Sequence, residues 1–194
     1  ISANPNMSHK GLLEGFLSRK RAERAEKLIP AEFRKGRLLD IGCGITPYFL
    51  TYADFKEKYG IDRLLEPQRI KGIKGEIELL PFDLEKITTL PFPGEYFSVV
   101  TMLAVFEHIE PNRLPFLINE IFRVLTKDGI YILTTPAAWT DGLLKWMAKF
   151  GLVDAHLVAE HKGVYPPETI RAYLEDSPFS AGKLAFGSFE AGVN

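Results

Sequence analysis

The apolar run YFSVVTML, at residues 96–103, constrains the fold more than any other part of the chain. Most of its positions are apolar, as in a strand that is buried on both faces. Strands of that kind lie inside parallel sheets, whose neighbouring strands are joined by helical crossovers. The run therefore predicts an α/β fold, in which strands and helices alternate along the chain.

Strands and helices do alternate between residues 37 and 134. The expected strands are 37–41, 58–62, 77–80, 96–103 and 129–134, and the expected helices are 47–54 and 114–125. Thr46 is expected to cap the first of these helices, with Pro47 at its first position. Lys127–Gly129 is expected to form the turn that ends the second helix. The predicted fold class is a Rossmann-like, doubly wound, mostly parallel α/β sheet with helices on both faces.

Further elements flank this core. An N-terminal helix is expected at 9–29, with its basic run RKRAER on a solvated face. Later expected elements are helices at 143–150 and 167–174 and an antiparallel edge strand at 183–190. We expect a single domain with three parts: an N-terminal helical segment (1–30), a core that carries the binding site (36–136), and a cover with the last strand (137–194). Because the chain begins with Ile1 rather than Met and stops soon after a strand-like segment, we expect a piece of a longer protein.

Composition disfavours several classes of partner and location. The 24 Lys and Arg residues and 25 Asp and Glu residues leave a net charge of -1, so we expect neither a nucleic-acid partner nor a membrane surface. The single cysteine excludes an internal disulfide and favours a reducing compartment, so we expect a cytoplasmic protein. No apolar run reaches the roughly 18–20 residues that a membrane helix needs, and no signal peptide is recognised.

The segment LLDIGCG, at 38–44, places two glycines just past the end of the first expected strand. Glycine at such a place allows a sharp turn and lets backbone approach a ligand. A reactive thiol at Cys43 would need a neighbouring base, and none is evident, so Cys43 is interpreted as a small buried filler. Pro47 replaces the third glycine of a dinucleotide fingerprint, and no phosphate-loop Gly-Lys-Ser/Thr occurs. A ligand cleft and a plain strand-to-helix turn remain the two interpretations.

Two further acids follow expected strands. Asp62 ends the second strand, and Asp83 follows the third. A carboxylate at the first place can accept hydrogen bonds from both hydroxyls of a ribose. The alternative for Asp62 is a turn aspartate. A carboxylate at the second place can accept a hydrogen bond from an exocyclic amine.

These segments together resemble the class I S-adenosylmethionine (SAM)-dependent methyltransferases. The resemblance rests on LLDIGCG, GID, FDLE, LPFPGEYFSVVTMLAVFEHI and EIFRVLTKDGIYILTTP, in that order over 38–136. It implies SAM as the cofactor, S-adenosylhomocysteine (SAH) as its product, and no metal. The implied cofactor-binding residues are Asp40, Gly42 and Gly44 for the methionine part, Asp62 for the ribose, Asp83 and Leu84 for the adenine, and Met102 and Leu103 near the sulfonium.

Three positions depart from the family pattern. Thr46 stands where a third glycine is common, and Ser98 stands where the fourth strand usually has aspartate. Arg63 replaces the apolar residue that packs on adenine. Its guanidinium plane could stack on the base instead, so Arg63 stays among the expected cofactor-binding residues.

Methyl transfer from a sulfonium is an in-line displacement, so the protein mainly aligns the acceptor. A general base is needed when the acceptor is a hydroxyl or a protonated amine. The candidates are the pair Glu107-His108, which follows the fourth strand and whose imidazole titrates near neutrality, and His161, in the expected cover. The alternatives are that Glu107 and His108 cap and brace the next helix and that His161 lies on the surface. Trp139 and Trp146 line either a core or an acceptor pocket.

The sequence therefore predicts a SAM-dependent methyltransferase that acts on a small-molecule acceptor. A catalytically inactive methyltransferase-like binding or regulatory protein is the main alternative. A nucleotide-cofactor oxidoreductase is disfavoured by the missing third glycine. A nucleic-acid methyltransferase is disfavoured because LAVFEH, at 103–108, stands where an Asn/Asp-Pro-Pro-aromatic motif is typical. The sequence specifies neither the acceptor nor the oligomeric state.

Overall fold

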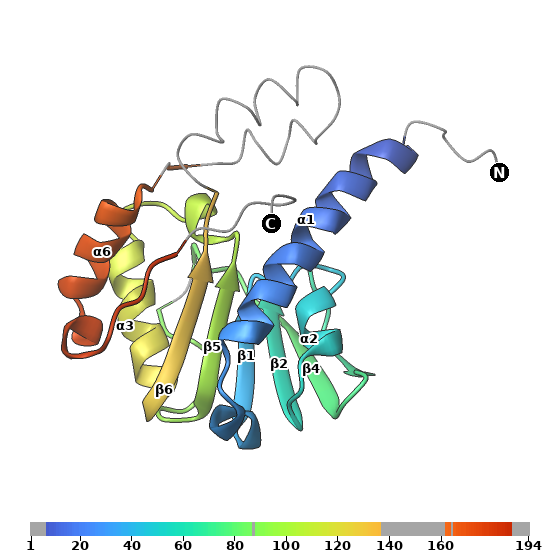
Figure 1. Cartoon of the computed structure of the whole chain (residues 1–194), viewed down its shortest axis with the longest axis horizontal. Coiled ribbons are helices and arrows are strands. Elements are labelled where there is room, and N and C mark those ends of the chain that lie inside the picture. The colour runs from blue at the N-terminus through green and yellow to red at the C-terminus, as the bar shows by residue number, and fades with distance from the viewer. Residues whose placement is uncertain (1–6, 87, 137–161, 164, 188–194) are drawn as a thin grey trace.

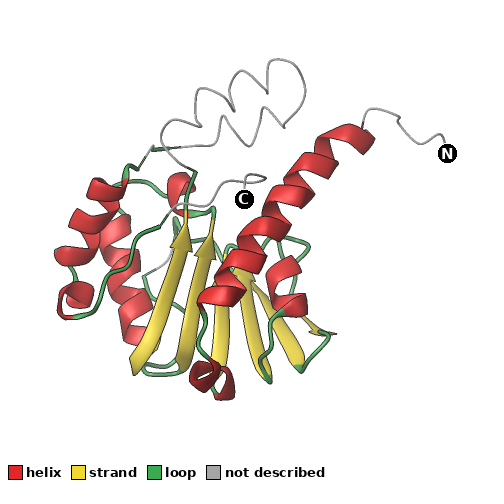
Figure 2. Cartoon of the chain, viewed as in Figure 1, coloured by secondary structure: helices red, strands yellow, loops and turns green. Residues whose placement is uncertain are grey.

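The computed structural model describes residues 7–86, 88–136, 162–163 and 165–187, and its centre is one six-stranded sheet (Figures 1 and 2). The strands are β1 (Arg37–Ile41), β2 (Glu57–Asp62), β3 (Gln68–Lys71), β4 (Glu76–Pro81), β5 (Phe97–Leu103) and β6 (Leu125–Thr134). Their order across the sheet is β3-β4-β2-β1-β5-β6. All neighbours are parallel except β3 and β4, which pair antiparallel. The chain leaves β1 toward β2 first and returns later to its other side at β5, so the ends of β1 and β5 mark the topological switch point.

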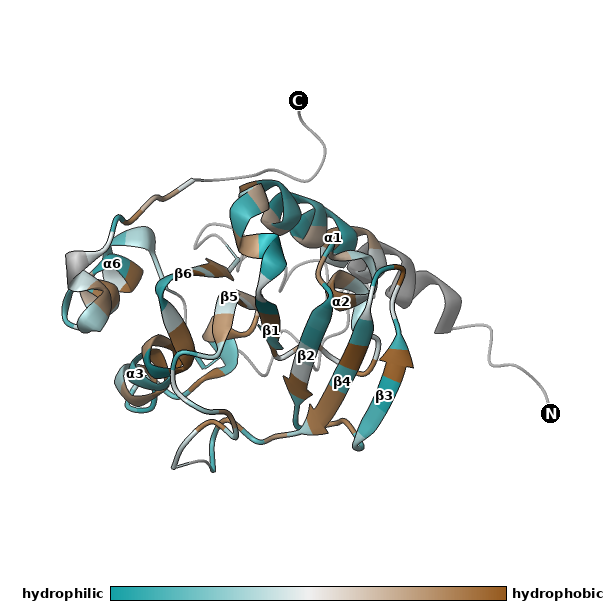
Figure 3. Ribbon diagram, turned by 90° about the horizontal axis from the view of Figure 1, so that it is seen from below, coloured by the Kyte–Doolittle hydropathy of each residue, from teal (hydrophilic) through white to brown (hydrophobic). Residues whose placement is uncertain are grey.

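Helices cover both faces of the sheet (Figures 1 and 3). The helices are α1 (Met7–Leu28), α2 (Tyr48–Tyr52), α3 (Leu114–Val124) and α6 (Pro167–Glu175), with short 3₁₀ helices η1 (Ala31–Lys35), η2 (Phe106–His108) and η3 (Pro178–Ala181). One buried cluster joins α1 and α2 to the sheet, and the other joins α3 and α6 to its opposite face. These two layers confirm the predicted Rossmann-like fold class.

Side-chain alternation along β1 assigns its residues to the two layers. Leu38 packs in the cluster with α1 and α2, whereas Leu39 and Ile41 pack in the cluster with α3. Successive side chains of a strand point to opposite faces. Asp40 therefore faces the α1 layer, as Leu38 does.

The five predicted strands and the helices at 9–29, 114–125 and 167–174 are confirmed within a few residues at their ends. The capping prediction at α2 was wrong by one position. Pro47, not Thr46, occupies the N-cap, and no side chain makes a capping hydrogen bond there. The predicted helix at 143–150 lies outside the described residues.

Strand β3 was missed because its sequence has no apolar alternation. Gln68, Arg69 and Lys71 are exposed, and only Ile70 is partly buried. An edge strand of this kind is held by backbone pairing with β4 rather than by a buried face. Hydrophobic periodicity therefore carries no signal for it.

The turn predicted at Lys127–Gly129 was also wrong. Helix α3 ends at Val124, and β6 begins at the next residue. The register passes from Phe97 opposite Leu125 to Val99 opposite Ile130, so the extra residues form an irregularity inside β6. Charged residues and a glycine are tolerated in a bulge as readily as in a turn.

The predicted antiparallel C-terminal strand is not present over 183–187, and residues 188–190 lie outside the described part. The guanidinium of Arg171, on α6, lies 4.5 Å from the ring centroid of Phe186. The segment therefore packs against a helix. Among the described residues, no helix is long and apolar enough to span a membrane.

A charged cluster ties the loop before β5 to α3. Glu120 Oε2 accepts hydrogen bonds from Thr89 Oγ1 (2.7 Å) and the Leu90 N–H (2.6 Å). Arg123 contacts the same carboxylate at 2.8 Å and donates to the Phe92 carbonyl at 3.0 Å. These bonds, with that of Arg123 the largest, lower the pKa of Glu120 to about 2.

We expect Glu120→Gln to lower the free energy of unfolding by about 1–3 kcal/mol at neutral pH, the range for hydrogen bonds to charged groups. The folded pKa of Glu120 lies below the unfolded one, so its stabilisation is complete above the unfolded pKa and is lost as pH falls toward about 2. Urea unfolding at neutral and acidic pH measures this effect. The control is Glu66→Gln, at an exposed glutamate. A deficit that stays constant with pH would contradict the prediction.

Candidate functional site

The turn after β1 forms the centre of the candidate site. Gly42 has φ 72° and donates its N–H to the Ile61 carbonyl at 2.8 Å, which ties the turn to β2. A Cβ at Gly42 would lie 2.3 Å from Val105 Cγ2, so packing excludes any side chain. Gly44 also has a positive φ, 71°, but no atom lies within 4 Å of the place of its Cβ. The turn therefore closes against the protein at Gly42 and is open at Gly44.

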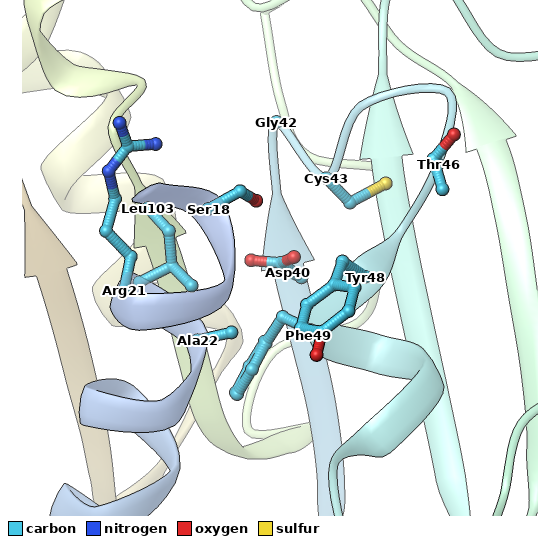
Figure 4. Close-up of a pocket in the computed structure, with 10 residues that line it drawn as sticks. All are labelled: Ser18, Arg21, Ala22, Asp40, Gly42, Cys43, Thr46, Tyr48, Phe49 and Leu103. Atoms are coloured by element: carbon cyan, nitrogen blue, oxygen red, sulfur yellow. The ribbon is translucent and has the colours of Figure 1, made fainter. Parts of the chain in front are cut away.

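A pocket lies between α1 and this turn (Figure 4). Helix α1 contributes Ser18 and, one helical turn further along, Arg21 and Ala22. The facing residues are Asp40, Gly42, Cys43, Thr46, Tyr48, Phe49 and Leu103. The pocket thus lies at the topological switch point, and its wall contains three of the predicted site residues, Asp40, Gly42 and Leu103.

Asp40 is the buried charge of this pocket. It is 4% exposed, and Oδ1 accepts a hydrogen bond from Thr101 Oγ1 at 2.7 Å. Burial raises the pKa of Asp40 to about 7; the negative charge of Asp62 adds to the rise, and the Thr101 bond opposes it. A buried carboxyl that lines a pocket becomes a stable carboxylate when a cation lies against it. The site is therefore suited to a positively charged ligand group.

Asp62 lies beside the open glycine. Its Oδ2 accepts from the Gly44 N–H at 3.0 Å, and its Oδ1 accepts from the Leu64 N–H at 2.9 Å. These bonds orient the carboxylate, and each oxygen keeps a further lone pair for a ligand hydroxyl.

Asp83 lies at the end of β4, next along the sheet edge. Its Oδ1 accepts from the Glu85 N–H at 3.1 Å, and its Oδ2 pairs with the exposed Lys86 at 2.9 Å. Lys86 is the largest cause that lowers the pKa of Asp83, and the charge of Arg63 also lowers it. The structure therefore brings Arg63 near Asp83. The adjacent Leu84 is partly buried against the core.

The predicted pair at the end of β5, Met102 and Leu103, has one residue in the core and one in the pocket wall. Met102 is fully buried, and its sulfur accepts a hydrogen bond from the Tyr131 hydroxyl at 3.2 Å. Leu103 lines the pocket. Cys43 also lines it, but burial first, then Asp40 and Asp62, raise the pKa of its thiol. A protonated thiol is a poor nucleophile, which supports the interpretation of Cys43 as a small filler.

Of the two predicted histidines, only His108 is among the described residues. His108 lies half-buried in η2, at the carboxyl end of β5. His161 lies outside the described residues, as do Trp139 and Trp146.

Sequence reasoning missed one charged residue at the site and did not foresee the burial of another. Arg21 lines the pocket, although its basic run was interpreted as a solvated face. The available signal was the spacing of Ser18, Ala22 and Ala25, small residues that place one face of α1 against the sheet. Glu107 precedes His108 and is only 3% exposed. Its burial depends on tertiary packing and has no local signal.

The comparisons with known proteins identify the family. A family model described as a methyltransferase domain matches residues 13–181. The chain belongs to the class I SAM-dependent methyltransferases. SAM is the cofactor of this family, as the sequence motifs implied. No curated protein matches the chain.

Three solved structures illustrate the likeness of fold. A SAM-dependent methyltransferase from Archaeoglobus fulgidus is 20% identical with TM-score 0.58, over 81% of this chain and 66% of that one. A second structure is the complex between the Haloferax volcanii Trm112 methyltransferase activator and the putative methyltransferase. Its matching chain is 15% identical with TM-score 0.59, and the match covers 91% of this chain and 76% of that one. A third is the plantazolicin methyltransferase BpumL in complex with SAH. It is 15% identical with TM-score 0.62, and the match covers 88% of this chain and 67% of that one. The match thus spans 66% of the length of the Archaeoglobus fulgidus protein.

The two glycines of the turn give a matched pair of variants. We expect Gly44→Ala to lower the free energy of unfolding by only about 1–2 kcal/mol, which is the cost of a positive φ at alanine. We expect the same variant to bind SAH at least tenfold more weakly. We expect Gly42→Ala to be destabilised further, because its Cβ also meets Val105. Denaturant unfolding and calorimetric titration with SAH measure the two effects. Wild-type SAH affinity in Gly44→Ala would show that the open space is not part of the cofactor site.

Proposed function

We propose that this methyltransferase transfers the methyl group of SAM to a small-molecule acceptor. The observation that carries the proposal is the buried carboxyl of Asp40 in a pocket that is walled by the glycine turn after β1. The net charge of -1 supports a small acceptor rather than a nucleic acid. The single cysteine supports a cytoplasmic location.

The residues present fit SAM along the edge of the sheet. Asp40 would accept hydrogen bonds from the ammonium group, and Arg21 would pair with the carboxylate of the same methionine part. Asp62 would hold the ribose hydroxyls. Asp83 and Leu84 would bind the adenine edge, with Arg63 stacked on the base. When bound, SAM supplies a methyl group that its sulfonium has already activated.

The protein's own part in the reaction is to orient the two substrates and keep water out. Helix α1 covers the pocket from one side, and the turn at Gly42 forms its floor. Leu103 would pack near the reacting end, with the backbone of Met102 beneath it. His108 is a candidate base at the end of β5, and His161 is a second one in the cover.

An inactive methyltransferase-like binding protein is the competing proposal. One similar structure is a complex with a methyltransferase activator, so association with a partner also occurs among proteins of this fold. Cofactor affinity and turnover separate the two proposals. An inactive relative can bind SAH yet fail to release it from labelled SAM with any acceptor.

Asp62→Ala tests the cofactor site. We expect micromolar SAM and SAH affinity in the wild type, and a loss of at least tenfold, about 1.4 kcal/mol, in the variant. Calorimetric titration measures both. The control Asp128→Ala removes an exposed aspartate in β6 and should bind like the wild type. Equal affinity in all three proteins would refute the ribose role of Asp62, and no binding to the folded wild type would refute the proposed function.

Cofactor binding should release a proton from Asp40. Its pKa is about 7 without ligand, because burial disfavours the carboxylate. The cationic groups of SAM favour the ionised form, so affinity should fall as pH drops below about 7. Titration in two buffers that differ in ionisation enthalpy counts the protons released. Asp40→Asn should remove this release, and a release that persists unchanged in that variant would assign the proton to another group.

A further inference from the structure

A second buried carboxyl, Glu107, lies at the carboxyl end of β5. It sits in η2 and is 3% exposed. Its Oε2 is buried and, among the described residues, has no hydrogen-bond partner. Buried carboxylate oxygens are normally satisfied, so an orphaned one marks a place for a ligand or a water.

Thr135, directly after β6, presents a second orphan beside it. Its Oγ1 is buried, and within the described ranges it also lacks a partner. The hydroxyl is close enough to lower the pKa of Glu107, yet the two groups do not meet the geometry of a hydrogen bond. A ligand O–H or N–H placed between them would satisfy both atoms, because the carboxylate accepts and the hydroxyl can do either.

Arg21 links this pair of orphans to the SAM pocket. Its positive charge acts on Glu107, and its side chain lines the pocket with Leu103. The sheet order places β2 and β4, which carry the proposed ribose and adenine contacts, on the far side of β1 from β5 and β6. Glu107 and Thr135 therefore lie on the side where the reacting end of SAM would meet an acceptor.

The backbone between Leu103 and Glu107 is held in a strained form. Ala104 has φ 57°, in the left-handed region that non-glycine residues avoid. Its N–H donates to the Thr134 carbonyl (2.9 Å) and hydroxyl (3.1 Å), so the ends of β5 and β6 are joined. Strain of this kind persists where neighbouring structure imposes it and is concentrated at functional sites.

The segment before α6 closes over η2. The Glu107 carbonyl accepts from the N–H groups of Lys162 (2.8 Å) and Gly163 (3.3 Å). The Lys162 ammonium pairs with Glu85 (3.2 Å) and Glu110 (3.0 Å). Nearby, the Tyr165 hydroxyl donates to the Ile109 carbonyl at 3.3 Å. The charge of Arg21, from α1, acts on the Glu107 side chain, and the charge of Glu107 acts in turn on Tyr165 of this segment.

We propose that Glu107 is the catalytic base of this methyltransferase, and that Thr135 helps it to bind the hydroxyl or amine group of the acceptor. The proposal rests on the proposed function. The acceptor's O–H or N–H proton passes to Glu107 Oε2, and the acceptor lone pair forms the bond to the methyl carbon. The carbon–sulfur bond breaks, and its electron pair stays on sulfur as the neutral thioether.

The electrostatic environment is consistent with this role. Burial raises the pKa of Glu107 to about 7, and its own backbone N–H, then Arg21 and Thr135, reduce the rise. A base whose pKa lies near the working pH is matched to proton transfer. The acceptor class is therefore a small molecule with a hydroxyl or a protonated amine.

The first test needs no acceptor and no cofactor. Ionising a buried Glu107 destabilises the fold as pH rises from its unfolded pKa through about 7. Glu107→Gln should therefore raise Tm by about 2–4 °C at pH 8 and leave it nearly unchanged at about pH 4, at or below the unfolded pKa of a glutamate. The control Glu175→Gln, in an exposed pair with Arg171, should show no such pH dependence. A variant that is less stable at both pH values would assign Glu107 a bracing role and overturn the proposal.

The second test separates base catalysis from positioning. Labelled SAM is offered with phenol, with phenethylamine, or with iodide, which has no proton to remove. Glu107→Gln should slow transfer to the phenol or amine about 100-fold or more, while SAH affinity and any transfer to iodide change less than twofold. Thr135→Val should raise KM for the phenol or amine more than it lowers kcat.

The outcomes separate this proposal from the proposed function. Equal transfer to phenol or amine by wild type and Glu107→Gln would overturn the base while leaving the methyltransferase intact. A wild type that binds SAH but neither methylates nor binds these acceptors would overturn the acceptor class. Failure of the folded wild type to bind SAH would overturn the proposed function itself, whereas the stability test of Glu107 would stand.

Discussion

The turn at Gly42 is the constraint on which the rest of the site depends. Its N–H is bonded to β2, and the space beside its Cα is filled by Val105, which follows β5. Gly42 therefore fixes the positions of the ends of β1, β2 and β5 relative to one another. The open glycine at Gly44 then places Asp62 beside the turn through a hydrogen bond of 3.0 Å. Side chains at this turn can be held rigidly because they lie on strand ends and not on long loops.

Two carboxyls, Asp40 and Glu107, are buried at this edge against the tendency of charges to stay in water. Burial raises the pKa of both to about 7. Each therefore destabilises the folded protein when ionised, and neither is needed to complete the hydrophobic core. Buried carboxyls that lower stability in this way are expected where a site is kept for activity rather than for stability. The surface pair of Glu120 and Arg123 behaves oppositely, since its bonds favour the charged form.

Much of the fold was predictable because apolar spacing is a local property. The strand at 37–41 and the helix from Leu114 follow directly from it, and the family model that matches residues 13–181 confirms the resemblance to methyltransferases. The errors fall where backbone pairing decides. Strand β3 has no buried face of its own, and Lys127–Gly129 is absorbed into β6 by its register with β5. The expected final strand over 183–187 also failed, because alternation does not specify which sheet edge will accept a strand.

The order of residues alone determined the family, the sheet, and the acids and glycines that follow its strands. These features depend on local pattern and motif spacing, so they are present before the chain folds. Only the tertiary structure decided that Asp40 faces α1, that Arg21 reaches the pocket, and that an oxygen of Glu107 and the hydroxyl of Thr135 are buried without hydrogen-bond partners among the described residues. Burial and pKa are set by what packs around a group, and the elements that pack around these residues are distant in the chain.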